Sequence, residues 1–524
     1  MSAATTPSTH ASPAHARRIL IVLATAALFV SFVETMLTPA LPDLATFFSN
    51  APYTTVAWIL TAYLLVGVAT IPIFSKLGDV YGKRRILAIV LSVYAVAVAL
   101  TPITPILGAE AGLTRAQSIY LLIATRGLQG IGLAMFPLAL AMAADSLPKE
   151  RIAPAQGLVA AMFGVGSALG LVGGSGLIES LGWQVAYASI VAPVALLPIL
   201  ARTWLPEGHR GTGSPIDYLA AGLLGGGLAL FLLGVTLGPT WGWTAWAPAA
   251  LSGRPFGAPM LFVLALLLIL GFVARSLRSP HPLIDLGRLR ERNIAIGYTG
   301  AILVGLAMYS AFVALTVLVE YPIVGLGLSI LSFGLMSIPT TAAMFVAGPL
   351  VGRGIARYGP RPMILLGSSI SAAGFALLLA FHGTFLELIV ESVPTFVGLV
   401  AILVSVTNVI AVSSRRGESG IHMGLTEMFQ DLGASVGPVV VASLLATFTR
   451  IVRVPSGDGP AGSVSALVPS ATAFDLIFAF GLATVAAAGV FGMLLHNYVA
   501  TPSAVPTPDP PQSELPAAPV SERV

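Results

Sequence analysis

Fourteen long apolar runs, separated by short polar segments, dominate the hydrophobic pattern of the chain. A helix that crosses the hydrocarbon core of a bilayer needs about 20 mostly apolar residues, and each run is of about that length. The pattern therefore predicts an all-α integral membrane protein. The expected spans are 19–39, 55–75, 85–104, 118–142, 153–177, 183–203, 216–238, 257–275, 294–318, 329–351, 363–381, 388–412, 422–447 and 472–497.

Composition supports this class of protein. Hydrophobic residues make up 56% of the chain, charged residues only 9%, and the mean hydropathy is +0.92. Soluble domains carry roughly 25% charged residues, so a soluble core of this size is excluded. The chain has no cysteine, which excludes disulfides, thiolate metal sites and cysteine nucleophiles. It also has no nucleotide-binding loop, metal-ligand cluster or nucleophile elbow. We therefore expect neither an enzyme nor a metal or cofactor, and no direct drive by ATP.

The positive charges indicate the orientation of the chain. With the N-terminus in the cytoplasm, all but five of the 26 Lys and Arg residues fall in inner loops and tails. This bias is the usual signal for the cytoplasmic side, and it requires an even number of spans. We expect a multi-pass protein of the plasma membrane with both termini in the cytoplasm. Because the net charge of +4 is spread over these loops, the expected partner is the lipid bilayer rather than nucleic acid. The exceptions are Arg115, Arg254, Arg450 and Arg453 in outer loops and Arg126 inside a span.

Two sequence features repeat, which indicates a duplication. The segment SKLGDVYGKRR at 75–85 returns in degraded form as GRGIARYGPRP at 352–362, at an offset of 277 residues. A glycine motif at 166–171 returns at 433–438, at an offset of 267. The simplest architecture is two six-helix bundles with two additional helices between them, a parallel repeat of the kind found in transporters. The expected divisions are an N-terminal tail at 1–18, bundles at 19–205 and 281–498, the added helices at 206–280, and a disordered cytoplasmic tail at 499–524.

Four charged residues inside the spans are the candidates for transport chemistry. A charge at the centre of a span costs about 2.5–3.5 kcal/mol on insertion scales and usually faces a protein interior or a water-filled cavity. Glu34 and Arg126 fall at similar depths, so they are expected near each other or in one cavity. Glu427 and Asp431 are four residues apart, hence on one helix face, and are expected on a cavity wall. Glu34 is the candidate proton carrier, and Arg126 would bias a carboxyl, bind an anion or bond backbone carbonyls. The alternative for the carboxyls is a structural role.

Glycines recur at four-residue spacing in the fifth and thirteenth spans, a pattern typical of close helix packing. Two interpretations stay open: packing alone, or a flexible or tightly sealed contact between the two halves. The residues are Gly166, Gly170, Gly174, Gly433 and Gly437.

The basic segment at 75–85 has a physical interpretation of its own. Its glycines are expected to permit a tight turn, while its cations hold the turn on the cytoplasmic side. Asp79 is expected to pair with one of these cations or with a helix N-terminus, a contact that would latch one conformation. The alternative is a simple topology anchor, and Ala356 at the matching place means that only one copy supplies the acid. The other residues of this candidate latch are Gly78, Gly82, Lys83, Arg84 and Arg85.

These motifs resemble those of the major facilitator superfamily, in its fourteen-span drug:proton antiporter branch. Residues 75–85 resemble the signature after the second span, with Ser75 where glycine is usual. RGLQG at 126–130 is similar to the fourth-span signature, whose arginine is linked to proton coupling in that family. HPLIDL at 281–286 resembles the loop after the added helices. The antiporter signature expects Gly-Pro in the fifth span, and this chain has Leu171 in place of the proline.

The resemblance implies a proton-coupled exporter of a small lipophilic compound or drug that works by alternating access and is driven by the proton gradient. The excess of carboxyls over Arg126 inside the spans favours a cationic compound. Its expected partners are the small-molecule substrate and protons, and a monomer is expected. Leu171 keeps an alternative open, a metabolite, siderophore or lipid-precursor transporter working by symport or facilitated diffusion. A transport-dead sensor or scaffold is a third interpretation, against which Glu34, Asp79 and Arg126 argue.

Overall fold

The apolar runs form helices in the computed structural model. It describes residues 13–497 except 38–39, 41–43, 45, 50, 52, 57, 208–216, 242–256, 281, 321–324, 329, 415–417 and 456–462. Within these residues, fourteen helical spans are long and apolar enough to cross a membrane. The fold class predicted from the sequence is confirmed. The Trp-rich segment after Trp241 and the tail at 499–524 lie outside the described residues.

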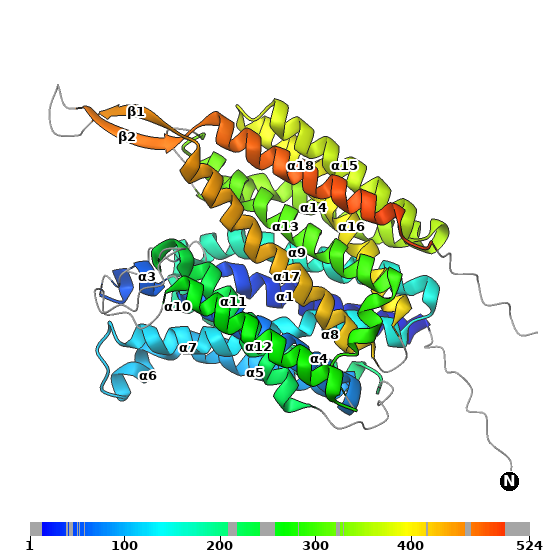
Figure 1. Ribbon diagram of the computed structural model, residues 1–524. Coiled ribbons are helices and arrows are strands. Elements are labelled where there is room, and N and C mark those ends of the chain that lie inside the picture. The colour runs from blue at the N-terminus through cyan, green and yellow to red at the C-terminus, as the bar shows by residue number, and fades with distance from the viewer. Residues whose placement is uncertain are drawn as a thin grey trace, which may run out of the picture.

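The N-terminal half contains six spans (Figure 1). Proline and glycine interrupt the third and fourth: a short 3₁₀ turn carries Pro102, which has no backbone N–H to donate, and another carries Gly132. The elements are α1 (Pro13–Met36), α3 (Tyr53–Val56), α4 (Trp58–Tyr81), α5 (Lys83–Leu100), η1 (Thr101–Ile103), α6 (Thr104–Glu110), α7 (Ser118–Gly130), η2 (Ile131–Ala134), α8 (Met135–Ser146), α9 (Lys149–Leu181) and α10 (Trp183–Trp204).

The remaining elements continue the chain through two further helices and a second set of six spans. They are α11 (Tyr218–Trp241), α12 (Ala258–Arg278), η4 (Leu286–Arg290), α13 (Arg292–Glu320), α14 (Ile330–Tyr358), α15 (Pro360–Ala380), α16 (Phe385–Ser413), α17 (Ser419–Thr447), β1 (Thr449–Pro455), β2 (Ser463–Pro469) and α18 (Ala471–Met493).

The glycine motifs pack helices within each half. A Cβ atom at Gly166 would overlap the carbonyl oxygen of Leu28, so α9 lies directly on the backbone of α1. In the second half, a Cβ atom at Gly433 would overlap the carbonyl oxygen of Ile302, so α17 lies in the same way on α13. In this arrangement these glycines contact helices of their own half. Gly170 and Gly174 face α1, and Gly437 faces α13.

A different set of glycines brings the two halves together. Gly157 of α9 and Gly348 of α14 lie backbone to backbone, since a Cβ atom on either would overlap the carbonyl oxygen of the other. Gly352 lies in the same way against Ala153. These contacts form a seam between the halves, which we call the α9–α14 seam. The sequence pattern did not single it out, because its glycines on the two helices are far apart along the chain.

Single glycines connect successive spans at two matching places. Gly82 joins α4 to α5 with a φ of 97°, and Gly359 joins α14 to α15 with a φ of 87°. L-residues with side chains rarely adopt this region, which explains why both copies of the basic segment have a glycine at this place. Gly78 is not part of the turn, contrary to expectation. It lies inside α4, where a Cβ atom would meet the side chain of Leu138.

The two added helices form a hairpin fixed to the N-terminal half. Helix α11 lies against α4, where a Cβ atom at Gly225 would come within 2.6 Å of the carbonyl oxygen of Ala69. At one end of the hairpin, Arg275 of α12 forms an ion pair of 2.7 Å with Asp217 beside α11. Helix α11 also contacts α17 across the junction of the halves. The domain boundaries expected from the sequence stay predictions.

A β-hairpin extends the C-terminal half beyond the helices. Strands β1 and β2 pair antiparallel, with Arg450 opposite Val468, and they project from the end opposite to the chain termini (Figure 1). Only an outer loop was expected here. Apolar and polar residues alternate over only a few positions in this stretch, so the sequence resembles a loop between two spans.

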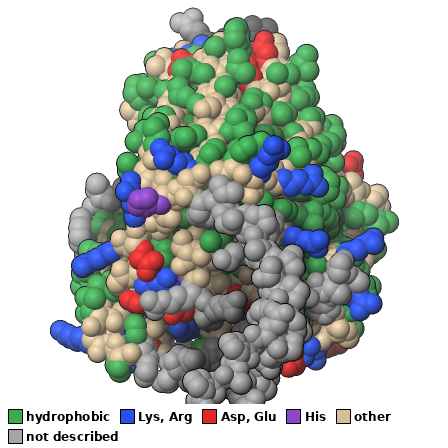
Figure 2. Space-filling model, turned by 90° about the vertical axis from the view of Figure 1, so that its right-hand side faces the viewer, with side chains coloured by type: hydrophobic (Ala, Val, Ile, Leu, Met, Phe, Trp, Pro, Cys, Tyr) green, Lys and Arg blue, Asp and Glu red, His purple; other side chains and the backbone are tan. Residues whose placement is uncertain are grey.

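The end of the molecule near the chain termini carries most of the basic side chains. We call it the basic end, and we call the opposite end the far end. Figure 2 looks onto the basic end and shows Lys and Arg side chains spread across it. At this end the start of α17 lies against α4, where a Cβ atom at Gly420 would meet Ser75 and Asp79, and Gly352 of α14 lies against Ala153 of α9. The molecule is therefore in an arrangement that is closed at its basic end.

The α9–α14 seam predicts the effect of one added side chain. Valine at Gly157 cannot fit against Gly348, so Gly157→Val should hold the basic end open. The chain has no cysteine, so a single Ala153→Cys substitution gives a unique target. Ala153 is buried, and its maleimide labelling should become faster in the Gly157→Val background. Gly222→Val is the control, because nothing lies within 4 Å of a Cβ atom there. Equal labelling rates in all backgrounds would contradict the assignment of the seam.

Candidate functional site

Arg126 is fully buried in the N-terminal half and holds the end of α1. Its guanidinium donates hydrogen bonds to the backbone carbonyl oxygens of Ile59 (3.3 Å), Val33 (3.4 Å) and Glu34 (3.2 Å). Val33 and Glu34 belong to the last turn of α1, where carbonyl groups lack partners within the helix. Arg126 therefore supplies hydrogen-bond donors to the helix end that carries Glu34, which is one of the roles expected from the sequence.

A polar network fixes the guanidinium in this position. Arg126 donates to Oε1 of Gln129 (2.7 Å), and the hydroxyl of Tyr187 donates to the same oxygen (2.8 Å). Nε2 of Gln129 donates to the hydroxyl of Thr101 (2.6 Å). The ring of Tyr63 lies 4.7 Å from the guanidinium carbon. Tyr187 was not identified from the sequence; a tyrosine inside an apolar span was the available signal.

The carboxyl group of Glu34 is not the group that Arg126 binds. Arg126 binds the backbone oxygen of Glu34, and no ion pair between the two side chains occurs among the described residues. Oε2 of Glu34 is buried and has no hydrogen-bond partner in that part of the chain, and the same is true of the Tyr63 hydroxyl beside it. The expected proximity of Glu34 and Arg126 is therefore present, but it runs through the backbone.

Three carboxyl groups, one from the N-terminal half and two from the C-terminal half, lie within electrostatic range of one another. Glu34 of α1 interacts electrostatically with Glu427 and Asp431 of α17. We call these three residues the carboxyl cluster. Tyr309 of α13 interacts electrostatically with all three, and its side chain is partly exposed. The sequence placed Glu427 and Asp431 on one helix face, but could not pair them with Glu34 or identify Tyr309, because this needs the packing of α1, α13 and α17.

Asp79 connects the halves at the basic end. Its two carboxylate oxygens accept hydrogen bonds from the backbone N–H groups of Gly420 (2.8 Å) and Ile421 (2.7 Å), in the first turn of α17. Only 2% of Asp79 is exposed. A carboxylate at a helix N-terminus is stabilised by the free N–H groups and by the helix dipole. The sequence expectation named a cation or a helix N-terminus as the partner, and Asp79 contacts both.

The cation is Lys83, which is buried between two carboxylates. Its Nζ lies 2.8 Å from Oδ1 of Asp79 and 2.5 Å from Oδ2 of Asp145. Ser419 of α17 donates to the other oxygen of Asp145 (2.7 Å). Asp79, Lys83, Asp145 and the start of α17 form what we call the acidic junction. The sequence suggested that Lys83 holds the turn at the membrane surface. Instead, it is only 1% exposed.

The two neighbouring cations differ from Lys83. Arg84 pairs with Glu207 and donates to the carbonyl oxygen of Leu205 (3.3 Å), which ties α5 to the end of α10. Arg85 is exposed. Of the three expected cations, only Lys83 takes part in the contact between the halves.

A second ion pair holds the start of α17 from the side of the C-terminal half. Arg288 of η4 pairs with Glu418 (2.6 Å) and Glu291 (2.9 Å) and donates to the carbonyl oxygen of Ser413 (3.1 Å). Partial burial lowers the pKa of Arg288, but the two carboxylates outweigh this effect and raise its pKa above the ordinary value. Asp285 begins η4 by accepting a hydrogen bond from Gly287 (3.0 Å). Part of the motif at 281–286 thus positions Arg288.

Ser75 occupies a tight place beside the acidic junction. A Cβ atom at Gly424 of α17 would overlap the Ser75 hydroxyl oxygen. Glycine on α17 therefore makes room for the serine that replaces the usual glycine of the signature. The hydroxyl oxygen of Ser75 is buried and has no partner among the described residues.

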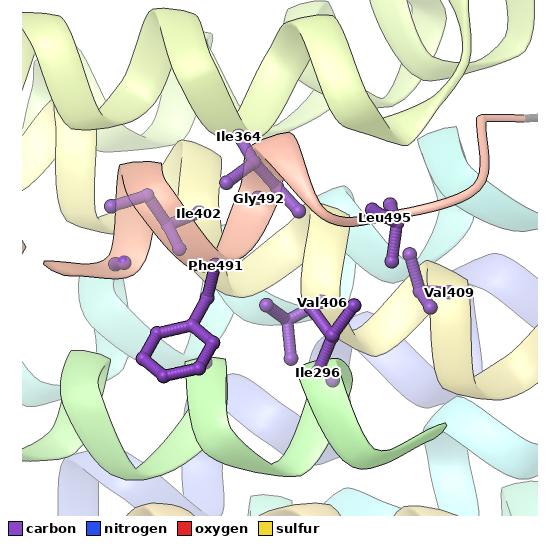
Figure 3. Close-up of a pocket in the computed structure, with 11 residues that line it drawn as sticks. Ile296, Ile364, Ile402, Val406, Val409, Phe491, Gly492 and Leu495 are labelled. Carbon is purple, nitrogen blue, oxygen red and sulfur yellow. The ribbon is translucent and has the colours of Figure 1, made fainter. Parts of the chain in front are cut away.

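A small pocket inside the C-terminal half has the wrong chemistry for the expected substrate (Figure 3). It lies between α13, α15, α16 and α18, and its lining is apolar, with Ile296, Ile402, Val406 and Phe491 among the residues around it. It has no charged or polar side chain to bind a cation or a proton. No group of His, Asp and Glu side chains that could hold a metal ion occurs in the described residues.

One buried carboxyl was not identified from the sequence. Glu391 of α16 is 3% exposed, and its Oε2 has no hydrogen-bond partner within the described part of the chain. The expected span began only three residues earlier, which made Glu391 look like a residue of the membrane surface. It lies in the C-terminal half, away from the acidic junction.

Comparison with known proteins identifies the family. A sequence model of the Major Facilitator Superfamily matches residues 23–438. The chain belongs to the major facilitator superfamily. It is therefore a multi-pass membrane transporter and not an enzyme.

Similar proteins include two bacterial exporters. The multidrug efflux pump LfrA of Mycolicibacterium smegmatis is 29% identical over 501 residues, covering 90% of this chain and 92% of that protein. The tetracenomycin C resistance and export protein of Streptomyces glaucescens is 26% identical over 404 residues, covering 76% and 70%. The crystal structure of the human organic anion transporter MFSD10 has the same fold, with a TM-score of 0.60 at 17% identity over 92% of this chain and 100% of that one.

The acidic junction predicts unequal effects of removing two adjacent cations. Lys83→Met leaves the buried Asp79 and the partly buried Asp145 without their cation, and breaking a buried ion pair costs about 3–5 kcal/mol. Thermal unfolding of the purified protein in detergent should therefore occur at a clearly lower temperature. Arg85→Met is the matched control and should change little, because Arg85 is exposed. Equal unfolding temperatures for the two variants would show that the junction contributes nothing to stability.

Proposed function

We propose that this transporter exports small lipophilic cations in exchange for protons, with the carboxyl cluster as the shared binding site. The observation that carries the proposal is the approach of Glu34, Glu427 and Asp431 from both halves. A cation and protons compete naturally for such a group, because either one neutralises the carboxylates. Similarity to the multidrug efflux pump LfrA supports export as the direction.

The cluster also suits a lipophilic cation rather than a small inorganic one. Tyr309 presents an aromatic ring close to the three carboxyl groups, and Phe312 is exposed one turn further along α13. An aromatic face binds an organic cation through its ring quadrupole. Flat aromatic cations gain further apolar contact with such rings.

Alternating access follows from the contacts between the halves. We place the basic end in the cytoplasm, following the positive-inside rule, so the present arrangement faces outward. Opening the cytoplasmic side requires Asp79 to leave the N-terminus of α17 and requires the α9–α14 seam to separate. Protonation of the carboxyl cluster removes charge between α1 and α17, which favours rearrangement of the two halves. Glu34 is the proposed proton carrier, because Arg126 fixes its helix end through the backbone while Oε2 of its carboxyl group accepts no hydrogen bond from the described residues.

Glu34→Gln separates proton coupling from substrate binding. In proteoliposomes with an imposed pH gradient, uphill transport of ethidium should fall by roughly tenfold, within the range of coupling between linked sites. Exchange of ethidium across the membrane without a gradient should persist, because Glu427 and Asp431 remain. Glutamine fills the same space, so the helix packing is preserved.

The control for this experiment is Glu179→Gln, since Glu179 is exposed at the far end of α9. It should transport like the unmodified protein. Full gradient-driven transport by Glu34→Gln would remove Glu34 from the mechanism. Ethidium movement in the same direction as protons would replace antiport with symport, the alternative suggested by Leu171.

Tyr309 tests the proposed cation preference. Replacing its ring with an aliphatic chain in Tyr309→Leu should weaken ethidium binding by about twofold to thirtyfold, which corresponds to the cation–π range of about 0.5–2 kcal/mol. Tyr309→Phe keeps the ring and should bind nearly as well as the unmodified protein. Ethidium fluorescence measures both dissociation constants. If the two variants weaken binding equally, the hydroxyl group matters and the aromatic face does not.

A further inference from the structure

A second pocket lies at the far end of the N-terminal half, apart from the carboxyl cluster. Its volume is about 420 Å³, within the usual range of small-molecule pockets. Three segments form it: the stretch after α1, the connection between α6 and α7, and the turn from α9 to α10. Phe47, Ile178 and Trp183 supply apolar walls, and Arg115 and Gln184 supply polar groups. The proposed exchange of cations and protons takes place at the carboxyl cluster and does not involve this pocket.

Arg115 is held in a way that leaves its donors available. Its guanidinium carbon lies 4.1 Å from the centre of the Phe47 ring. The Phe47 ring in turn meets Trp183 edge to face, with ring centres 5.4 Å apart. No carboxylate or carbonyl accepts a hydrogen bond from Arg115 among the described residues. A guanidinium stacked on a ring keeps its N–H groups directed outward along its edge, where they suit a two-oxygen anion.

Trp183 provides a second, independent sign of a missing acceptor. The residue lines the pocket and is only 4% exposed, and its indole N–H has no hydrogen-bond partner within the described part of the chain. A buried N–H without an acceptor costs about 1–3 kcal/mol, so an acceptor is expected there. The indole and Arg115 are both donors. The group that satisfies them must therefore carry acceptor oxygens.

The depth of the pocket indicates where this group comes from. Trp183 is the first residue of the sixth span, and Ile178 belongs to the last turn of the fifth. The pocket therefore lies where the spans leave the hydrocarbon core, at the level of the lipid headgroups. The residues that line the pocket include no carboxylate, so the ammonium group of a zwitterionic lipid would have no partner.

We propose that this pocket binds the phosphate of an anionic phospholipid through Arg115, with an acyl chain against Phe47 and Trp183. The phosphate oxygens accept hydrogen bonds from the guanidinium edge and, after a small shift, from the indole N–H. The aromatic walls cover the first part of the acyl chain. A bound lipid would contact all three segments of the N-terminal half that line the pocket.

Native mass spectrometry of the purified full-length protein tests the proposal. The delipidated protein is titrated with phosphatidylglycerol or phosphatidylcholine at equal concentrations. We expect phosphatidylglycerol to be retained preferentially, and Arg115→Gln to lower its occupancy by about tenfold. Arg115→Lys keeps the charge but loses the planar fork and should give an intermediate loss. Arg115 is exposed, so these substitutions should not affect folding, which an unchanged unfolding temperature verifies.

A matched control and a second readout complete the test. Arg450→Gln removes another exposed arginine at the far end, in β1, and should leave lipid retention unchanged. Phosphatidylglycerol brominated on its acyl chains should quench tryptophan emission, and Trp183→Phe should remove part of that quenching. Equal lipid loss from Arg115→Gln and Arg450→Gln would overturn the proposal. So would displacement of the lipid by millimolar inorganic phosphate, which would show a site for free anions instead.

Discussion

The closed arrangement of the two halves depends on a buried carboxylate placed against a helix N-terminus. Asp79 and Asp145 carry two negative charges and Lys83 one positive charge. The N-terminus of α17 adds about half a positive charge through its free N–H groups, so the net negative charge of the junction is roughly halved while the halves touch. Separation removes hydrogen-bond donors from Asp79 and an anion from α17 at the same time. The contact is therefore strong when made and can be replaced by water when broken, as a switching contact requires.

The two halves share the same internal packing, but two different kinds of contact join them to each other. Glycines on α9 and α17 bring these helices onto α1 and α13 in equivalent ways. Between the halves the symmetry ends. One side is joined by charge at Asp79, and the other by backbone contact between Gly157 and Gly348. Salt and pH act on the first kind of contact far more than on the second, so the two sides of the interface respond differently to the same change of conditions.

The sequence predicts the fold better than the site, and the reason is physical. Apolar runs of membrane length and the bias of positive charge are local properties, so the fourteen spans and their order could be read directly. The partners of each charge depend on how helices pack. Arg126 was placed at the right depth, but its bond to the backbone of Glu34 depends on where α1 ends. Asp79 was expected to pair with a nearby cation, but the burial of Lys83 also depends on Asp145, which lies 62 residues away in the sequence. Tyr309 and Tyr187 had no charge to draw attention to them.

The β-hairpin between α17 and α18 has a mechanical consequence. Each strand has seven residues, which corresponds to a length of about 23 Å at about 3.3 Å per residue. Since β1 directly follows α17, the hairpin is an arm attached to the helix whose other end binds Asp79. A small tilt of α17 that frees its N-terminus would swing the arm through a much larger arc on the opposite side of the membrane. Such a tilt would therefore be largest at the surface opposite the contact between α17 and Asp79.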